Sequence, residues 1–151
     1  MNPEDTRVSG QLKKVLVVDD DESTAAFVRA VLQPARYEVM AAGDGLAGLA
    51  RARKEHPDLI ILDVYMPRQV GFYTLSDLKK DPETRDIPVI MLTGVAKRMG
   101  FSYAPEDIYD FLGAEPDVYL EKPVDPDFLV ETADKLLGMG PAADGLPTKE
   151  K

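Results

Sequence analysis

The chain has 151 residues and an apolar fraction of 44 %, which suits one folded domain with a real core and excludes a disordered chain. It contains no cysteine and a single histidine, which excludes disulfides, thiol catalysis and metal sites built from cysteine or several histidines. The net charge of −9 makes nucleic acid and anionic membranes poor partners and favours divalent cations and basic protein surfaces.

The two ends of the chain lack the apolar periodicity of its middle. We expect residues 1–12 to form a flexible N-terminal arm, residues 13–137 to fold as one domain, and residues 138–151 to form a flexible tail. The first residues contain no apolar stretch typical of a signal peptide, and no apolar run has the length of a membrane span. These features predict a soluble, cytoplasmic protein.

Short apolar runs rich in β-branched residues alternate with helical patterns along the middle of the chain. In chain order, these patterns predict a strand at 15–18, a helix ending at Gln33–Pro34, a strand at 37–42, a helix at 44–55, a strand at 59–62, a helix at 72–80, a strand at 89–92, a short helix at 105–113, a strand at 117–121 and a helix at 125–137. Asp44 and Asp125 have the acceptor side chain of a helix N-cap, and Pro126 suits a first helical position. Strands that alternate with helices indicate a doubly wound α/β fold, with helices on both faces of a five-stranded parallel sheet.

Polar side chains follow four of the predicted strands, at the point where each strand ends. These are the acidic run Asp19–Asp21, then Asp63, then Thr93, and then Lys122. Ligands of an open parallel sheet bind outside the carboxyl ends of its strands, so we expect these side chains to lie together. At a separation of ~4 Å and an effective dielectric of about 20, each pair of carboxylates repels by about 4 kcal/mol. A cation or a proton must offset this repulsion.

The residue types in this group are those of a phosphoryl-transfer site. Oxygen ligands favour a hard cation such as Mg²⁺. The hydroxyl of Thr93 and the ammonium of Lys122 can bind phosphoryl oxygens, and a carboxylate such as Asp63 can act as the nucleophile. Each residue alone has an ordinary explanation, since Asp20 or Asp21 can simply cap the first helix. Their occurrence together at the ends of four strands favours the site.

Four stretches of the sequence resemble a known family, and they occur in the order of that family. They are VLVVDDD (15–21), LIILDVYMP (59–67), DIPVIMLTG (86–94) and YLEKP (119–123). The sequence is similar to response-regulator receiver domains, the phospho-acceptor modules of two-component phosphorelays. The resemblance spans nearly all of residues 13–137 and implies a flavodoxin-like sheet with strand order 2-1-3-4-5.

The resemblance also implies which residues form the phospho-acceptor and its metal site. Asp63 would be the residue that is phosphorylated, in the manner of a signalling acceptor rather than an enzyme. Asp19, Asp20 and Asp63 itself would bind Mg²⁺ (or Mn²⁺), together with the backbone carbonyl of Tyr65. At most, such a domain catalyses its own phosphorylation and its own slow dephosphorylation.

Four further residues match positions that have a defined role in this family. Thr93 would donate a hydrogen bond to it, and Lys122 would bind it as a counter-ion. Pro123 would follow a cis peptide bond with Lys122. Tyr119 would act as an aromatic switch that follows Thr93 inward and changes the nearby surface.

The same resemblance implies protein partners. We expect a sensor histidine kinase or phosphotransfer protein as donor and a downstream protein as target, with neither nucleic acid nor membrane bound directly; a homodimer is left open. Because the segment after Leu137 is too short for an output domain, we expect a stand-alone receiver. The segment between Thr93 and Tyr119 is longer than usual for the family, so partner choice does not carry over.

Two other functions stay open from the sequence. A pseudo-receiver would serve only as a protein-binding scaffold. Such a scaffold would not need Thr93 and Lys122 in addition to the acidic pair Asp19 and Asp20. A phosphatase with an aspartyl nucleophile usually carries a second aspartate two residues on, where this chain has Tyr65, so turnover by such an enzyme would be slow.

Three local motifs suggest other sites, and each has a simpler explanation. Residues 43–48 match the dinucleotide-binding pattern G-x-G-x-x-G, but they follow the second strand instead of the first, so we interpret these glycines as allowing a tight turn and close helix packing. The acidic run 19–21 is no EF-hand, because Thr24 and Ala30 stand where glycine and glutamate are required. We interpret His56 as a surface residue near a helix C-terminus and not as a phosphohistidine.

Overall fold

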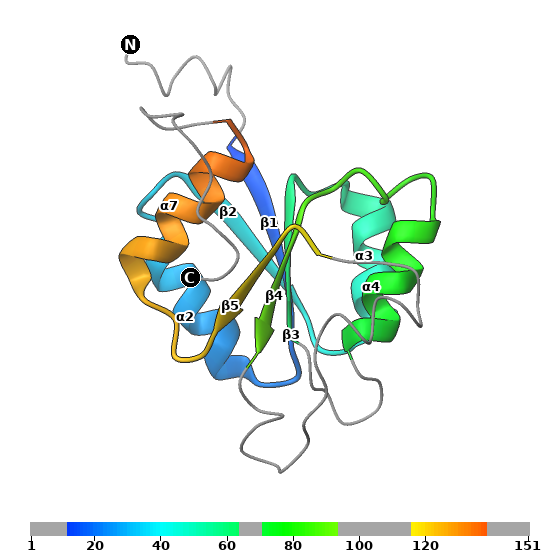
Figure 1. The fold of residues 1–151 in the computed structure, drawn as a ribbon, viewed down its shortest axis with the longest axis horizontal. Helices are drawn as coiled ribbons and strands as arrows, with labels where there is room; N and C mark the ends of the chain where they lie inside the picture. Colours follow the sequence, from blue (N-terminus) through cyan, green and yellow to red (C-terminus); the bar gives the residue numbers. More distant parts are fainter. Residues whose placement is uncertain (1–11, 64–70, 94–115, 139–151) are drawn as a thin grey trace.

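A computed structural model describes residues 12–63, 71–93 and 116–138 (Figure 1). The strands are β1 (Lys13–Val18), β2 (Tyr37–Ala42), β3 (Leu59–Asp63), β4 (Val89–Thr93) and β5 (Val118–Glu121). The helices are α2 (Glu22–Leu32), α3 (Gly45–Glu55), α4 (Gly71–Lys80) and α7 (Pro126–Leu136). The helix predicted at 105–113 lies outside the described residues, as do residues 1–11 of the arm and 139–151 of the tail. Within the described ranges, no helix has the length and apolarity to cross a membrane.

The strands form one parallel sheet in the order β2-β1-β3-β4-β5, which confirms the predicted order. In the ladder, Val18 of β1 lies beside Leu62 of β3, and Thr93 of β4 lies beside Glu121 of β5. The carboxyl ends of these strands therefore meet at one edge of the sheet (Figure 1). Residues that follow different strands in the sequence are brought to the same edge in this way.

The sheet is covered by helices on both faces, as predicted. Figure 1 shows α2 and α7 on one side of the strands and α3 and α4 on the other. Along β1, Val15 and Val17 belong to the core beneath α2 and α7, whereas Leu16 and Val18 belong to the core beneath α3 and α4. Both sets are almost fully buried, which explains why the strand is continuously apolar.

Four strand boundaries differ from the sequence prediction. The strands β3 and β4 each extend one residue further, to Asp63 and Thr93. The strand β1 begins at Lys13 instead of Val15, because Lys13 and Lys14 already pair with β2 despite their polar side chains. The strand β5 begins at Val118 instead of Asp117. Asp117 lies in a bend just before the strand, and its side chain accepts a hydrogen bond from the backbone N–H of Val89 at 2.8 Å.

Aspartates cap three of the helices. The carboxylate of Asp44 accepts the N–H of Ala47 at 2.8 Å at the start of α3, and that of Asp125 accepts the N–H of Phe128 at 2.9 Å at the start of α7. Both caps were predicted. At the start of α2 the cap is Asp21 and not Asp20, a choice that the sequence left open.

The glycine pattern at 43–48 serves the packing of α3 on the sheet. A Cβ atom on Gly48 would lie 2.8 Å from a methyl carbon of Val18, whereas one on Gly43 would have no neighbour within 4 Å. Gly48 therefore allows α3 to lie close against β1, as the sequence suggested. His56, which ends this helix in a left-handed conformation (φ 50°), is exposed.

Candidate functional site

Three carboxylates meet at the carboxyl edge of the sheet. Asp19 and Asp20 follow β1, and Asp63 ends the neighbouring strand β3. Each offers a carboxylate oxygen, and these three oxygens lie within 4.8 Å of one another. Asp19 and Asp63 are only 7 % and 3 % exposed, whereas Asp20 is open to solvent. Asp19 and Asp20 of the acidic run thus form one cluster with the distant Asp63.

Lys122 reaches this acidic cluster from the turn after β5. Its Nζ atom lies 3.1 Å from Oδ1 of Asp63 and 3.5 Å from Oδ2 of Asp19. The lysine side chain is itself mostly buried, with 22 % exposed. The peptide bond between Lys122 and Pro123 is cis, the form that the resemblance implies. One ammonium group therefore faces both buried carboxylates.

The surroundings disfavour the charged form of the buried carboxylates. The pKa of Asp63 is raised from 3.8 to about 6, mainly because the carboxylate is buried and also because the charge of Asp19 is close, while the Lys122 ammonium acts in the opposite direction. Burial also raises the pKa of Asp19, while the N–H of Asp21 and the Lys122 ammonium lower it. A single lysine thus leaves the cluster short of positive charge, which a proton or a further cation can supply.

The donor set fits a hard cation. Oδ2 of Asp19 and Oδ1 of Asp63 are buried, and neither accepts a well-formed hydrogen bond from the described residues, although both face Lys122. Buried polar atoms normally have a partner. With a carboxylate oxygen of Asp20 nearby, these atoms form an oxygen-only set of the kind that Mg²⁺ prefers.

The remaining predicted site residues are only partly within the described structure. Thr93 is the last residue of β4, and its backbone lies beside Glu121. Tyr119 is half-buried on β5 and packs against the core beneath α3 and α4. Tyr65 lies outside the described residues. The hydroxyl role of Thr93, the switch role of Tyr119 and the carbonyl role of Tyr65 stay predictions.

One contact at the site was not expected from the sequence. The backbone N–H of Asp21 donates to Oδ1 of Asp19 at 2.9 Å, so the residue that caps α2 also contacts a member of the acidic cluster. The sequence pattern that points to the cap is an aspartate two residues before Ser23, which is typical of such a turn. That pattern does not show the contact with Asp19.

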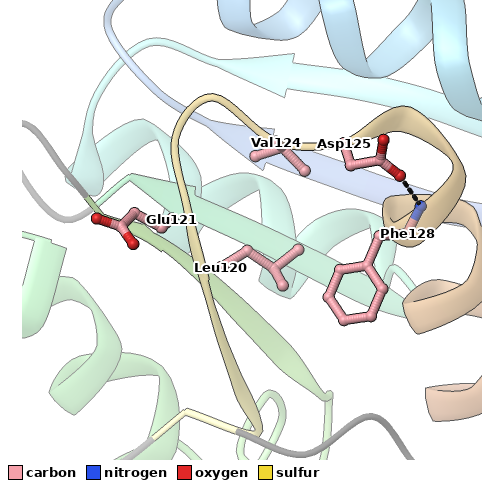
Figure 2. Close-up of a pocket in the computed structure, with 5 residues that line it drawn as sticks. All are labelled: Leu120, Glu121, Val124, Asp125 and Phe128. Carbon is pink, nitrogen blue, oxygen red and sulfur yellow. Dashed lines mark hydrogen bonds between the residues drawn. The ribbon is translucent and has the colours of Figure 1, made fainter. Parts of the chain in front are cut away.

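A pocket of about 300 Å³ lies next to the site, between β5 and α7 (Figure 2). Its lining residues are Leu120, Glu121, Val124, Asp125 and Phe128. This lining has no cation to bind a phosphate, and the carboxylate of Asp125 already accepts the N–H of Phe128. The chemistry expected of the site therefore belongs to the acidic cluster and not to this pocket.

Comparison with known families agrees with the fold. Residues 15–134 match the family model of the response regulator receiver domain. The chain belongs to this family. It is therefore a receiver domain of two-component signalling.

Curated relatives of this receiver domain differ in length. It is 35 % identical over 130 residues to the DNA-binding dual master transcriptional regulator RpaA of Synechocystis sp., covering 83 % of this chain and 49 % of that regulator. It is 39 % identical over 112 residues to the response regulator PleD of Caulobacter vibrioides, covering 74 % of this chain and 23 % of PleD. It is 33 % identical over 126 residues to the polar-differentiation response regulator DivK of Brucella ovis, covering 83 % of this chain and 97 % of DivK. The chain thus spans about half of RpaA and nearly all of DivK.

Solved structures share the fold of this receiver domain. The chemotaxis protein CheY4 of Vibrio cholerae superposes with a TM-score of 0.70 at 35 % identity, covering 84 % of this chain and 100 % of CheY4. A CheY-like receiver domain protein of Methanospirillum hungatei superposes with a TM-score of 0.71 at 29 % identity, covering 85 % and 95 % of the two chains. The fold is therefore the flavodoxin-like fold of CheY-like proteins.

Proposed function

We propose that this receiver domain stores a signal as an aspartyl phosphate on Asp63. The groups that would hold Mg²⁺ (or Mn²⁺) are the carboxylates of Asp19, Asp20 and Asp63 and the backbone carbonyl of Tyr65. The observation that carries the proposal is the acidic cluster, whose three carboxylate oxygens lie within 4.8 Å of one another. Two of its oxygens are buried without a well-formed hydrogen bond from the described residues, which suits a site built to hold a cation.

The transfer is a single displacement at phosphorus. The carboxylate of Asp63 attacks the phosphorus of a phosphohistidine, an O–P bond forms, the N–P bond breaks, and the histidine nitrogen keeps the electron pair. When bound, the cation supplies positive charge that neutralises both the carboxylates and the incoming phosphoryl oxygens. Lys122 adds a fixed ammonium 3.1 Å from Oδ1 of Asp63, close to the place where the new charge arrives.

Phosphorylation changes the partners of three residues. The phosphoryl group adds roughly −1.5 to −2 units of charge and three acceptor oxygens. Lys122 then pairs with a phosphoryl oxygen, and the hydroxyl of Thr93 donates a hydrogen bond to another. Tyr119, which is half-buried beside β4, follows Thr93 and alters the surface near β5.

The partners follow from this role. The donor is a sensor histidine kinase or a phosphotransfer protein, and the recipient of the signal is a downstream protein. The folded unit is residues 13–137, and it works in the cytoplasm. Because Tyr65 stands where an aspartyl phosphatase carries its second aspartate, the domain is an acceptor that turns over slowly and not a phosphatase.

Phosphoryl uptake tests the proposal directly. Wild type, Asp63→Asn and Asp77→Asn are incubated with Mg²⁺ and acetyl phosphate, and the intact proteins are weighed by mass spectrometry. Asp77 is an exposed residue of α4 and serves as the matched control. We expect one phosphoryl group on wild type and on Asp77→Asn, and none on Asp63→Asn. Equal uptake by all three proteins would contradict the assignment, and no uptake by any would favour the scaffold function.

A further inference from the structure

The turn between β1 and α2 is held together by Asp21. Its carboxylate Oδ1 accepts hydrogen bonds from the backbone N–H of Ser23 at 2.9 Å and from the Ser23 hydroxyl at 2.7 Å. Its backbone carbonyl accepts the N–H of Thr24 at 3.0 Å. Its backbone N–H donates to Oδ1 of Asp19 at 2.9 Å. One residue therefore connects the first turn of the helix to a carboxylate of the acidic cluster.

The contact with Asp21 fixes the orientation of the Asp19 carboxylate. Because Oδ1 of Asp19 accepts the Asp21 N–H, the other oxygen, Oδ2, faces the interior of the cluster. That oxygen is buried and lies 3.5 Å from Nζ of Lys122. The direction of one proposed metal ligand is thus set by the backbone of the cap residue.

Asp21 also constrains Asp20, the proposed ligand that is exposed. Asp20 lies in the chain between two residues whose positions are fixed by the same hydrogen bonds. The side chain of Asp20 is exposed and is not held by packing, so the backbone of Asp20 must direct its carboxylate toward the cluster. Asp21 itself is not one of the three residues whose carboxylate oxygens meet within 4.8 Å. It therefore contributes by its conformation and not as a ligand.

We propose that Asp21 is a positioning residue for the cation: its side-chain cap on α2 holds the backbone that orients Asp19 and Asp20. This inference rests on the proposed function, since it concerns the same cation. Groups that orient metal ligands commonly change metal affinity about 10- to 100-fold when they are removed. Alanine at this position has no acceptor for the Ser23 N–H and hydroxyl, so the turn loses the bonds that fix the Asp21 N–H against Asp19.

The negative charge of Asp21 offers a different explanation for any effect on the cation, and one substitution separates the two. Asn at this position keeps a side-chain oxygen that can accept both bonds from Ser23 but carries no charge. Asn is also as good an N-cap as Asp. If position matters, Asp21→Asn retains the affinity, and if charge matters, it loses affinity as much as Asp21→Ala does.

The experiment is a calorimetric titration of Mg²⁺ into the full chain at pH 7.5, without a phosphoryl donor. We expect Asp21→Ala to bind Mg²⁺ about tenfold more weakly than wild type, and Asp21→Asn to bind within about twofold of it. Asp44→Ala is the matched control, because Asp44 is a cap of the same chemistry on α3 and is not one of the clustered residues. It should lower the midpoint of thermal unfolding and leave the Mg²⁺ affinity unchanged.

Asp21→Gly is a second variant, which tests the inference even if Asp21→Ala does not fold. Glycine at an N-cap costs a helix little, yet it offers no acceptor to Ser23. We expect its Mg²⁺ affinity to fall as in Asp21→Ala while the protein stays folded.

The possible outcomes separate this inference from the proposed function. Equal weakening in Asp21→Asn and Asp21→Ala would overturn the positioning role in favour of charge. Unchanged affinity in both Asp21→Ala and Asp21→Gly would overturn it as well, while the proposed function would stand if wild type binds Mg²⁺ and Asp63→Asn does not. If wild type binds no Mg²⁺, both the cation site and the positioning role are wrong.

Discussion

At the level of single residues, Asp63 carries a charge that its surroundings disfavour. Burial and the nearby charge of Asp19 raise its pKa from 3.8 to about 6, so between these two pH values the folded protein binds more protons than the unfolded chain. The free energy of unfolding of the metal-free protein therefore falls as the pH rises through this window. Above pH ~6 the whole of this cost is present.

Removal of the Asp63 charge should therefore stabilise the metal-free protein. We predict that Asp63→Asn raises the free energy of unfolding by about 1–2 kcal/mol at pH 7.5, less than the full pKa shift implies because the amide that replaces the carboxylate is itself a buried polar group. The gain should disappear near pH 4, where the wild-type carboxyl is already neutral in the folded state. Urea unfolding at both pH values in the presence of a chelator measures the difference, and an equal gain at the two pH values would contradict it.

At the level of secondary-structure elements, the packing of α3 on β1 sets where the acidic run begins. Gly48 of α3 faces Val18, the last residue of β1, and Asp19 follows directly. A side chain at Gly48 would push against Val18, because its Cβ would lie 2.8 Å from a Val18 methyl carbon. The distance between α3 and β1 thus influences the position of Asp19.

Gly48→Ala should destabilise the protein by about 1 kcal/mol. Overpacking of this kind costs about 1–3 kcal/mol, and the better helix propensity of alanine returns up to about 1 kcal/mol. Gly43→Ala is the control, since a Cβ there meets nothing within 4 Å, and it should leave the stability nearly unchanged. Both are compared with wild type by urea unfolding. If Gly48→Ala were as stable as Gly43→Ala, the close approach to Val18 would carry no energetic weight.

At the level of the whole molecule, the parallel sheet gathers charges that the chain keeps far apart. Asp19 and Asp63 come from the neighbouring strands β1 and β3, and Lys122 follows β5, which is separated from β3 by β4. The chain as a whole has a net charge of −9, so any added salt also reduces general repulsion. A specific cation must therefore be distinguished from screening.

Binding of Mg²⁺ should stabilise the folded chain. At a free concentration ten times its Kd, we predict a gain of about 1.4 kcal/mol in the free energy of unfolding at pH 7.5. The gain should shrink at pH 5, where protons compete for Asp63, and should be much smaller in Asp63→Asn. Thermal unfolding with MgCl₂, and with KCl at equal ionic strength, measures it. An equal effect of the two salts would show screening alone.

Much of this protein could be predicted from local patterns in its sequence. The runs Val15–Val18 and Leu59–Leu62 are continuously apolar, which indicates strands that are buried on both faces, and the structure confirms these strands. The caps at Asp44 and Asp125 follow from chemistry within a few residues of each helix start. The cluster of site residues was predictable as well, because parallel strands must end at one edge.

Other features required the three-dimensional arrangement. The sequence did not distinguish Asp20 from Asp21 as the cap of α2, because both have the acceptor side chain and the backbone conformation selects between them. It did not give the raised pKa of Asp63 or the place of Lys122 between two carboxylates. These properties depend on burial and on distances between residues from different strands, and such distances are set only when the sheet and its helices pack.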